Sequence, residues 1–404
     1  MKDIGPIFRA LLHNKLGALL IILQIALTLA IVTNAAFIIR QRSADIERPT
    51  GVDEANTAVF YTTVYDKQMD QRQLIRDDLE ALRAIPGVVA VSPTNSVPAS
   101  GSGWGEDLYN DPEMPSNEAI SVGKFMVDEH GLKALDLELV AGSNFRPEDM
   151  VTRSMGEITQ PRVLLVSQAL ADELFPDGDA LGKTIWDEPG GKSPMRIIGV
   201  FDQMQNAWPT STSIDRTVLM PELMLFGYPM YVVRAEPGRL NEVMKAAETY
   251  LSQTRGRLID RARSFEENKR RTYAGDIAMV KLLTAVIVVL TAVTALGIVG
   301  LAWFSVTQRR KQIGTRRALG ATRGAIVQYF MVENSLITLT GLAVGLLATV
   351  GLNWFLDTQY SVGRLPLWYL PAGMAGLWLL GQLAVLLPAR RAAGIPPSLA
   401  TRSV

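Results

Sequence analysis

Four long apolar runs constrain this chain more than any other feature of its sequence. A helix needs about 20 apolar residues to cross the hydrocarbon core of a bilayer. Residues 16–39 and 282–307 contain no Asp, Glu, Lys or Arg, and residues 336–356 and the shorter 370–387 are equally free of charge. Buried helices of soluble proteins seldom run so far without a charged residue. We therefore predict four transmembrane helices.

The first run has features of a retained anchor. It is too long for the apolar core of a signal peptide, and no clear cleavage motif follows it. We expect residues 16–39 to stay in the membrane as an uncleaved first span.

Trp354, Trp368 and Tyr369 flank the last two runs, where interfacial aromatic residues belong.

Lysine and arginine in the short connections indicate the orientation, because cytoplasmic loops carry the excess of positive charge. Residues 308–325 carry six such residues and no acid, and the C-terminal tail is also basic. The connection 358–368 carries one arginine. We predict a multi-pass inner-membrane protein, with both termini and residues 308–325 in the cytoplasm and residues 40–276 outside.

The outside region is expected to mix helices and strands. Apolar residues recur at helical spacing in its first part, and Pro86-Gly87 ends that helix. The expected helices are residues 71–85 and 240–251, and the expected strands are residues 88–91 and 230–233. The predicted fold class is four transmembrane α-helices with a large α+β domain between the first two. That domain would combine one βαβ-like layer with a β-rich insertion from about 108 to 225.

A charged segment leads from this domain into the second run. Residues 255–271 place Leu258, Ala262 and Phe265 on one helical face. We expect a helical stalk that continues into the bilayer and transmits rigid-body motion. An ordinary solvated linker helix is an equal alternative.

Composition and motifs exclude several kinds of chemistry. Lys plus Arg and Asp plus Glu are equal, at 40 each, so no basic field favours nucleic acid. The chain has no cysteine, and His13 and His130 alone cannot build a usual zinc site. Residues 178–184 resemble a phosphate-binding loop, but three residues instead of four separate the glycines. We predict a glycine turn before a strand there, no catalytic residues, and no bound metal or cofactor.

The predicted spans carry almost no ionisable side chains, which argues against an ion-coupled transporter. Small residues recur four apart in the last two spans, and such spacing lets helix backbones approach closely. Glycine is also simply common in membrane helices, which is an equal alternative. The candidate helix-packing residues are Gly341, Gly345, Ala372 and Gly376, and the polar side chains that can hydrogen-bond between helices are Gln24, Thr28 and Asn34.

The basic loop is the most informative stretch. If it is helical, its arginines share one broad face at 100° per residue, with Ile313 in the middle. An apolar knob ringed by arginines suits docking into a groove on an acidic partner protein. The alternative is a cluster that binds lipid head groups. Gly314, Gly320 and Gly324 weaken the helix prediction.

Several segments in order resemble the MacB/FtsX-type ABC transporter permeases. The loop reads RRKQIGTRRAL and continues GATRGAI, which is similar to the family's signature after the second span. The same holds for FRALLHNKLGALLIILQIALTLA, LEALRAIPGVVAVSP, LVAGSNFRPEDM, LVSQALADELFPDGDALGKTI with IIGVF, and PARRAAGIPPSLATR. The resemblance covers nearly the whole chain, and the order of the segments is more specific than any one of them.

The resemblance implies a type VII ABC architecture with a porter-like layer in the outer domain. The loop would couple to a cytoplasmic ATPase, and stalks would relay its closure outward, which is called mechanotransmission. Because residues 1–15 alone precede the first span, we expect that ATPase, with its ATP and Mg²⁺, to be a separate polypeptide. The coupling residues would be Arg309, Arg310, Gln312, Ile313, Gly314, Arg316, Arg317, Leu319 and Gly320.

Further partners follow from the same resemblance. They are a second permease copy or paralogue, a periplasmic membrane-fusion adaptor and membrane lipids. The leading hypothesis is export or extraction of a periplasmic or outer-leaflet substrate. The alternatives are an FtsX-like regulator of a cell-wall hydrolase, a lipoprotein-release permease, a signalling receptor and a membrane enzyme. A receptor would need a cytoplasmic output domain, and the motif search does not support an enzyme.

The expected boundaries follow the runs. They are 1–15 for an amphipathic cytoplasmic segment, 16–39 for the first span, 40–276 for the outer domain with its stalks, 277–307 for the second span, 308–325 for the coupling loop, 326–357 for the third span, 358–368 for an outer loop, 369–388 for the fourth span and 389–404 for the tail.

Overall fold

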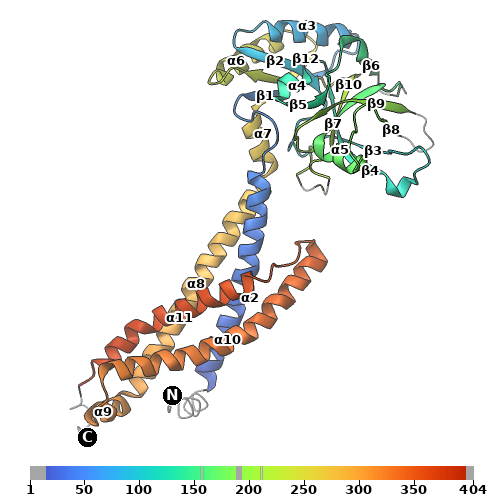
Figure 1. The fold of residues 1–404 in the computed structure, drawn as a ribbon. Helices are drawn as coiled ribbons and strands as arrows, with labels where there is room; N and C mark the ends of the chain where they lie inside the picture. Colours follow the sequence, from blue (N-terminus) through green and yellow to red (C-terminus); the bar gives the residue numbers. More distant parts are fainter. Residues whose placement is uncertain are drawn as a thin grey trace. The chain divides into compact units, whose positions relative to one another are not determined.

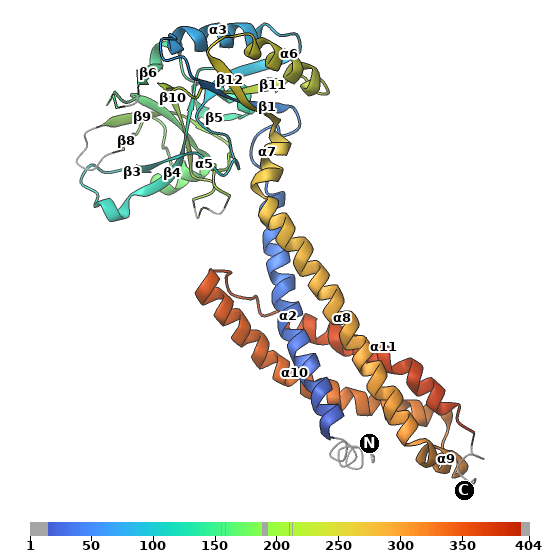
Figure 2. The same ribbon diagram turned by 180° about the vertical axis from the view of Figure 1, so that it is seen from behind.

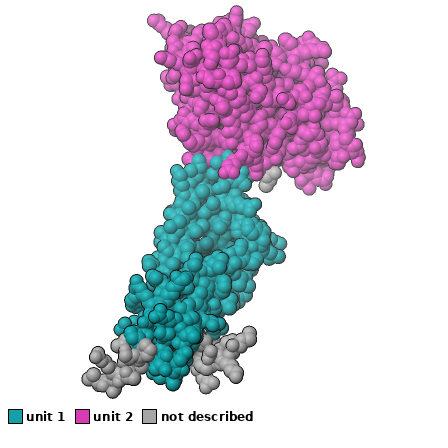
Figure 3. Space-filling model, turned by 60° about the vertical axis from the view of Figure 1, so that its left-hand side comes forward, with its two compact units in different colours: residues 1–46, 275–404 teal, residues 47–274 magenta. Residues whose placement is uncertain are grey.

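The computed structural model divides the chain into two compact units. It describes residues 15–154, 156–157, 159–187, 193–209, 211 and 213–396. A helical unit falls within residues 1–46 and 275–404, and an α/β domain comprises residues 47–274 (Figures 1 and 3). The predicted amphipathic segment and the end of the predicted tail lie almost wholly outside the described residues.

Four helices in the described residues are long and apolar enough to cross a membrane. They are α2 (Lys15–Glu47), α8 (Ala274–Gln308), α10 (Arg323–Tyr360) and α11 (Tyr369–Ala393), and the short helix α9 (Arg310–Ala318) connects α8 to α10 (Figure 2). At 1.5 Å per residue, the 33 residues of α2 and 35 of α8 exceed the roughly 30 Å of the hydrocarbon core. Both helices therefore extend beyond the membrane.

Helices α2 and α8 run antiparallel and contact each other at several levels. The hydroxyl groups of Thr28 and Thr294 lie 2.8 Å apart in a buried hydrogen bond. Near the other end of the pair, Arg42 forms an ion pair with Asp276 at 3.5 Å. This contact confirms the prediction that Thr28 forms a hydrogen bond between helices. Inside an apolar bundle, two hydroxyl groups can pair with each other where no water is present.

Helix α10 packs closely on α2 through two glycines. A Cβ added to Gly345 would lie 2.9 Å from the Cα of Ala26, and one at Gly341 would lie 3.0 Å from the Cβ of Ile25. The Nδ2 group of Asn34 donates to the carbonyl oxygen of Thr349 at 3.2 Å. Side chains larger than hydrogen at these two glycines would separate the helices.

The second candidate pair behaves differently. Ala372 is exposed, and a Cβ at Gly376 would meet nothing within 4 Å. The close approaches of α11 are made instead at Gly373, beside Thr33 of α2, and at Gly381, beside Thr338 of α10. The small residues that pack α11 are therefore offset from the predicted ones.

The α/β domain contains a four-stranded antiparallel sheet in the order β12-β1-β11-β2. Its strands are β1 (Thr57–Val64), β2 (Val88–Thr94), β11 (Met230–Ala235) and β12 (Arg257–Ser264), with α3 (Gln71–Arg83) and α6 (Leu240–Ser252) as crossovers. Two split β-α-β units interlock in this way. The predicted helices and strands at both ends of the domain are confirmed.

Side chains alternate between the two faces of this sheet, and both faces are largely buried at β1, β2 and β11. Phe60 and Tyr231 join an apolar cluster with Ile75 of α3 and Val243 of α6. Val59, on the opposite face, joins the main core of the domain. The apolar, β-branched composition of β1, β2 and β11 matches burial on two sides, whereas the edge strand β12 is charged and partly exposed.

The β-rich insertion forms an eight-stranded sheet, with the path β3-β4-β10-β7-β9-β5 and with β6 and β8 paired to β10 and β9. Its strands are β3 (Trp104–Leu108), β4 (Ile120–Val127), β5 (Leu139–Gly142), β6 (Val151–Ser154), β7 (Val163–Ser167), β8 (Thr184–Trp186), β9 (Pro194–Phe201) and β10 (Thr217–Leu225). The short helices α4 (Gly131–Leu135) and α5 (Gln168–Leu174) also belong to it. Gly178 and Gly182 have positive φ before β8, so the predicted glycine turn is confirmed.

The predicted helical stalk at 255–271 is wrong in its first half. Residues Arg257–Ser264 form strand β12, and only Phe265–Thr272 form a helix, α7. Strand β12 pairs with β1 along its length, and Arg257 is buried. The hydrogen bonds of a sheet edge outweigh the weak helical pattern of this segment, which is an effect of tertiary context.

Candidate functional site

The connection between α8 and α10 is built from three local signals. Thr307 and Gln308 end the apolar run, and α9 then covers Arg310–Ala318. Gly320 has φ +98°, a conformation that favours glycine, and so it turns the chain sharply. The hydroxyl group of Thr322 accepts a hydrogen bond from the amide of Ala325 and thereby caps α10. The expected helix is confirmed over Arg310–Ala318 only; Arg323 lies in α10, beyond the turn, and does not share a helical face with the other arginines.

The predicted coupling residues do not share one environment. Ile313 and Gly314 are buried within the helical unit, while Arg309 and Arg317 are half-buried. The others face outward, and they are Arg310, Gln312, Arg316, Leu319 and Gly320.

Ile313 is not an exposed knob, and that expectation is wrong. Its side chain is 5% exposed and belongs to an apolar cluster with Ile326 and Phe330 of α10 and Ala389 of α11. Helices α10 and α11 therefore use this side chain as packing. The exposed apolar side chain is Leu319, which is 83% exposed at the end of α9.

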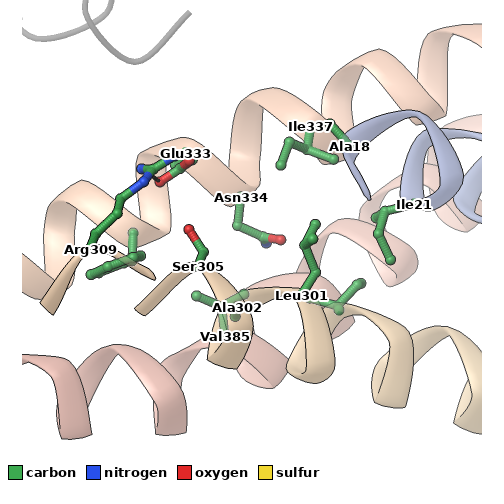
Figure 4. A pocket seen from close by; sticks show the side chains of 12 residues that line it. Ala18, Ile21, Leu301, Ala302, Ser305, Arg309, Glu333, Asn334, Ile337 and Val385 are labelled. Atoms are coloured by element: carbon green, nitrogen blue, oxygen red, sulfur yellow. Dashed lines mark hydrogen bonds and ion pairs between the residues drawn. The ribbon is translucent and has the colours of Figure 1, made fainter. Parts of the chain in front are cut away.

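Arg309 connects the start of α9 to α10 (Figure 4). Its Nη1 atom lies 3.0 Å from Oε2 of Glu333 and donates to the hydroxyl group of Tyr329 at 3.2 Å. Glu333 is 7% exposed, so its charge depends on this partner. The ion pair fastens the junction of α8 and α9 to the third long helix.

Tyr329 receives a second arginine from the same connection. The guanidinium group of Arg316 lies 4.8 Å from the centre of its ring, in a cation–π contact. Arg317 donates to the carbonyl oxygen of Ala321 at 3.4 Å. Both ends of α9 are thus attached to its neighbours.

A small cavity of about 50 Å³ adjoins Arg309 and Glu333, and residues of all four long helices line it. Ala18, Leu301 and Val385 are among its apolar walls, and Figure 4 shows Asn334 beside them. The Nδ2 atom of Asn334 has no hydrogen-bond partner among the described residues. A polar group of this kind in a cavity of this size suits a water-sized guest.

Our sequence analysis missed Glu333 and Tyr329. A signal was present, because Glu333 is the only acidic residue between Asp276 and Asp357. A lone acid beside an apolar run marks an ion pair or a pathway. Only the fold shows that its partner is Arg309, 24 residues earlier.

Among the described residues, no group of three His, Asp or Glu side chains is arranged to hold a metal ion. The fold and this connection define a class: multi-pass membrane proteins with a large α/β domain inserted after the first of four helices. Two family models cover the sequence, the MacB-like periplasmic core domain over residues 17–250 and the FtsX-like permease C-terminal region over residues 284–397. The chain belongs to the MacB/FtsX-type family of ABC transporter permeases.

Curated relatives agree with this family. The macrolide export ATP-binding/permease protein MacB of Chromobacterium violaceum is 28% identical over 294 residues, which are 69% of this chain and 42% of the relative. MacB of Neisseria meningitidis serogroup A is 29% identical, over 64% of this chain and 39% of the relative. MacB 1/2 of Paracoccus denitrificans is 28% identical, over 80% and 46%. The chain spans less than half the length of these relatives.

Two solved structures are also similar to parts of the chain. The periplasmic region of MacB from Actinobacillus actinomycetemcomitans matches 56% of this chain and 96% of that chain, at 14% identity and a TM-score of 0.34. The extracellular domain of the ABC-type transporter YknZ from Gram-positive bacteria matches 50% and 100%, at 14% identity and a TM-score of 0.32.

Proposed function

We propose that this chain is the membrane subunit of a MacB-type exporter and that a nucleotide-hydrolysing partner docks on α9. The observation that carries the proposal is the outward face of α9. The residues that face outward include Leu319, Arg310 and Lys311, while Ile313 packs against α10 and α11 and Arg316 stacks on Tyr329. An exposed apolar side chain on a basic segment fits an acidic groove on a protein partner. ATP and Mg²⁺ act in that partner, and this chain contributes no catalytic group.

The anchoring of α9 supports transmission of force as the mechanism. A force on α9 displaces Arg309, and the ion pair of Arg309 with Glu333 transmits that displacement to α10. Helix α8 continues from this junction to Asp276, where it pairs with Arg42 of α2. Because α2 and α8 are longer than a membrane span, movement at one end reaches the segments that enter the α/β domain. The work is mechanical, and the cargo need not pass between the helices.

The orientation belongs to the same proposal. The basic connection and the termini lie in the cytoplasm, and the α/β domain lies outside the inner membrane. The cargo is taken from the periplasm or the outer leaflet, and a membrane-fusion adaptor receives it. A second permease copy or paralogue packs against the lipid-facing helices, where α8 and the small residues Ala372 and Gly376 are exposed.

An FtsX-like regulator of a cell-wall hydrolase and a lipoprotein-release permease are second candidates, since the FtsX-like permease region matches residues 284–397. Co-purification separates them from export. An adaptor that co-purifies favours export, a hydrolase favours regulation, and an acceptor of lipoproteins favours release.

The docking test uses Leu319→Asp. We expect this charge to abolish co-purification of an ATPase with the full-length permease, because it places an acid in the centre of the proposed contact. The matched control is Leu367→Asp, which changes an equally exposed leucine, at 81%, in the connection between α10 and α11. Full ATPase recovery with Leu319→Asp would refute docking on α9.

The orientation test uses single cysteines, since the natural chain has none. Thr315→Cys on α9 and Asp107→Cys on β3 both occupy exposed positions. We expect a membrane-impermeant maleimide to label position 107 in cells with a permeabilised outer membrane, and position 315 only after the inner membrane is opened. Labelling of both positions from one side would end the proposal.

A further inference from the structure

A groove of about 450 Å³ lies in the α/β domain, and none of the residues that line it belongs to α9 or its neighbours. Strands β1 and β12, helix α7 and the segments around 95–102 and 226–230 line it. Most of the polar groups that line it are hydroxyl, amide and guanidinium groups, and the lining contains one carboxylate. Its lining includes Tyr61, Phe226, Tyr228, Arg261, Arg263 and Asn268.

The guanidinium groups carry unbalanced positive charge. Arg261 and Arg263 form no ion pair with any described residue, although a third arginine, Arg271, is paired with Glu267 at 2.8 Å. Arg261 lies 4.6 Å from the ring centre of Tyr61. The one carboxylate in the lining, Asp260, accepts a hydrogen bond from Thr63. The groove therefore offers two cations with free donors.

A buried amide supplies the second observation. Asn268 on α7 is 6% exposed, and its Oδ1 atom accepts from the hydroxyl group of Tyr61 at 3.3 Å. Its Nδ2 atom has no hydrogen-bond partner among the described residues. A buried donor without a partner is energetically costly. Since Asn268 lines the groove, a ligand with an acceptor would satisfy it.

Aromatic rings adjoin the polar part. Phe226 and Tyr228 have ring centres 6.0 Å apart, and Trp104 lies 6.4 Å from Phe226. Tyr228 is exposed, although such rings are usually buried or used in binding. This side of the groove fits a flat or apolar body.

We propose that the groove is a binding site for a small amphipathic anion, with its carboxylate or phosphate group held by Arg261, Arg263 and Asn268 and its apolar body against Phe226 and Tyr228. Bidentate guanidinium contacts and an amide N–H are the usual partners of such oxygens. The site is complete within this one chain. It therefore holds whether or not a partner ATPase docks on α9.

The binding test uses isothermal titration calorimetry on the full-length protein in neutral detergent. The probe is 2-naphthyl phosphate, and 2-naphthoate tests the carboxylate form. We expect saturable binding of at least one of these anions, weakened by salt. 2-Naphthol and inorganic phosphate each carry half of the recognised chemistry and should bind at least tenfold more weakly. Equal binding of neutral 2-naphthol would overturn the anion assignment.

Variants locate the site. We expect Arg263→Gln and Asn268→Asp each to weaken binding about tenfold to hundredfold, the range for a lost hydrogen bond to a charged group. Arg255→Gln removes an exposed arginine outside the groove and should bind as the natural chain does. If Asn268→Asp lowers the thermal unfolding midpoint, Arg261→Gln is measured in its place, because Arg261 is exposed. Unchanged affinity in both Arg263→Gln and Arg261→Gln would show that the anion binds elsewhere and would overturn the assignment of this groove.

Discussion

The ion pair between Arg309 and Glu333 is the residue-level feature on which the proposed coupling rests. Both side chains are largely buried, and a charge left without its partner in such surroundings is costly. Sequence reasoning weighed Arg309 only as one member of a basic face. Its contact with α10 gives it a different role from that of the exposed Arg310.

Replacing Glu333 tests this role. We expect Glu333→Gln to lower the free energy of unfolding by up to about 3–5 kcal/mol, since the positive charge of Arg309 loses its partner. The readout is the thermal unfolding midpoint of the full-length protein in detergent. Arg310→Gln is the matched control, because it removes an exposed arginine one position away. An unchanged midpoint in Glu333→Gln would show that the pair contributes no stability.

The α/β domain has its own buried charge pair. The carboxylate of Asp78 accepts hydrogen bonds from Arg257 and, at 2.5 Å, from the hydroxyl of Tyr231. Arg257 also donates to the carbonyl oxygen of Leu251 at 2.8 Å. Burial raises the pKa of Asp78, and burial raises the pKa of Tyr231 well above its usual value. The network joins α3, β11 and β12.

Breaking this pair from one side should be worse than removing it whole. We expect Asp78→Ala to destabilise the protein by about 3–5 kcal/mol, and the double change Asp78→Ala with Arg257→Met to cost less than the single one. The midpoint of thermal unfolding measures both. A double variant that loses as much as the two single variants together would mean that the side chains act independently.

At the scale of elements, the contact of α2 with α10 depends on glycine. Gly341 and Gly345 bring the two helix backbones close together, whereas Ala372 and Gly376 on α11 are exposed, and a Cβ at Gly376 would meet no described residue within 4 Å. The same sequence spacing therefore has two different uses. Spacing identifies small faces, but the fold selects which of them is covered.

A leucine scan distinguishes these faces. We expect Gly345→Leu to lower stability by at least about 1–3 kcal/mol, because the added side chain meets the backbone of Ala26. Gly351→Leu lies on the same helix and meets nothing within 4 Å, so it should be neutral. Detergent-solubilised yield and thermal midpoint are the measurements. Equal losses in the two variants would contradict the close packing of α2 and α10.

At the scale of the whole molecule, buried carboxylates of the α/β domain set a pH dependence. Burial raises the pKa of Asp78 and of Asp128 above the ordinary value of 3.8, although Arg83 beside Asp128 acts in the opposite direction. The folded chain therefore binds protons more tightly than the unfolded chain. By linkage, the contribution of these two groups to stability is full below 3.8 and falls as the pH rises through the raised pKa.

Asp128→Asn isolates this effect. We expect the stability of this variant to fall less steeply than that of the natural chain as the pH rises above about 4, since asparagine does not titrate. The level of stability also drops because Arg83 loses a partner, so the slope is the informative quantity. Asp177→Asn, at an exposed position, should keep the natural slope. Identical slopes in the natural chain and Asp128→Asn would refute the raised pKa.

Particular elements show how far sequence reasoning reached. The helix at Gln71–Arg83 and the strand at Met230–Ala235 were predictable, because their apolar spacing and the Pro86-Gly87 stop are local signals. Strand β12 was not, because its eight residues become a strand only beside β1. Ile313 shows the same limit in the site. The sequence shows that Ile313 lies between arginines, but its burial depends on contacts with α10 and α11.

The sequence by itself determined the four membrane helices, the inserted α/β domain and the basic connection, since hydrocarbon rejects charge and the pattern needs no partner to be read. Only the tertiary structure decided which side of α9 faces outward, that Glu333 pairs with Arg309, and that Asn268 lines the same groove as Arg261 and Arg263. These residues are separated along the chain, and their energies arise only when folding removes water and brings them together.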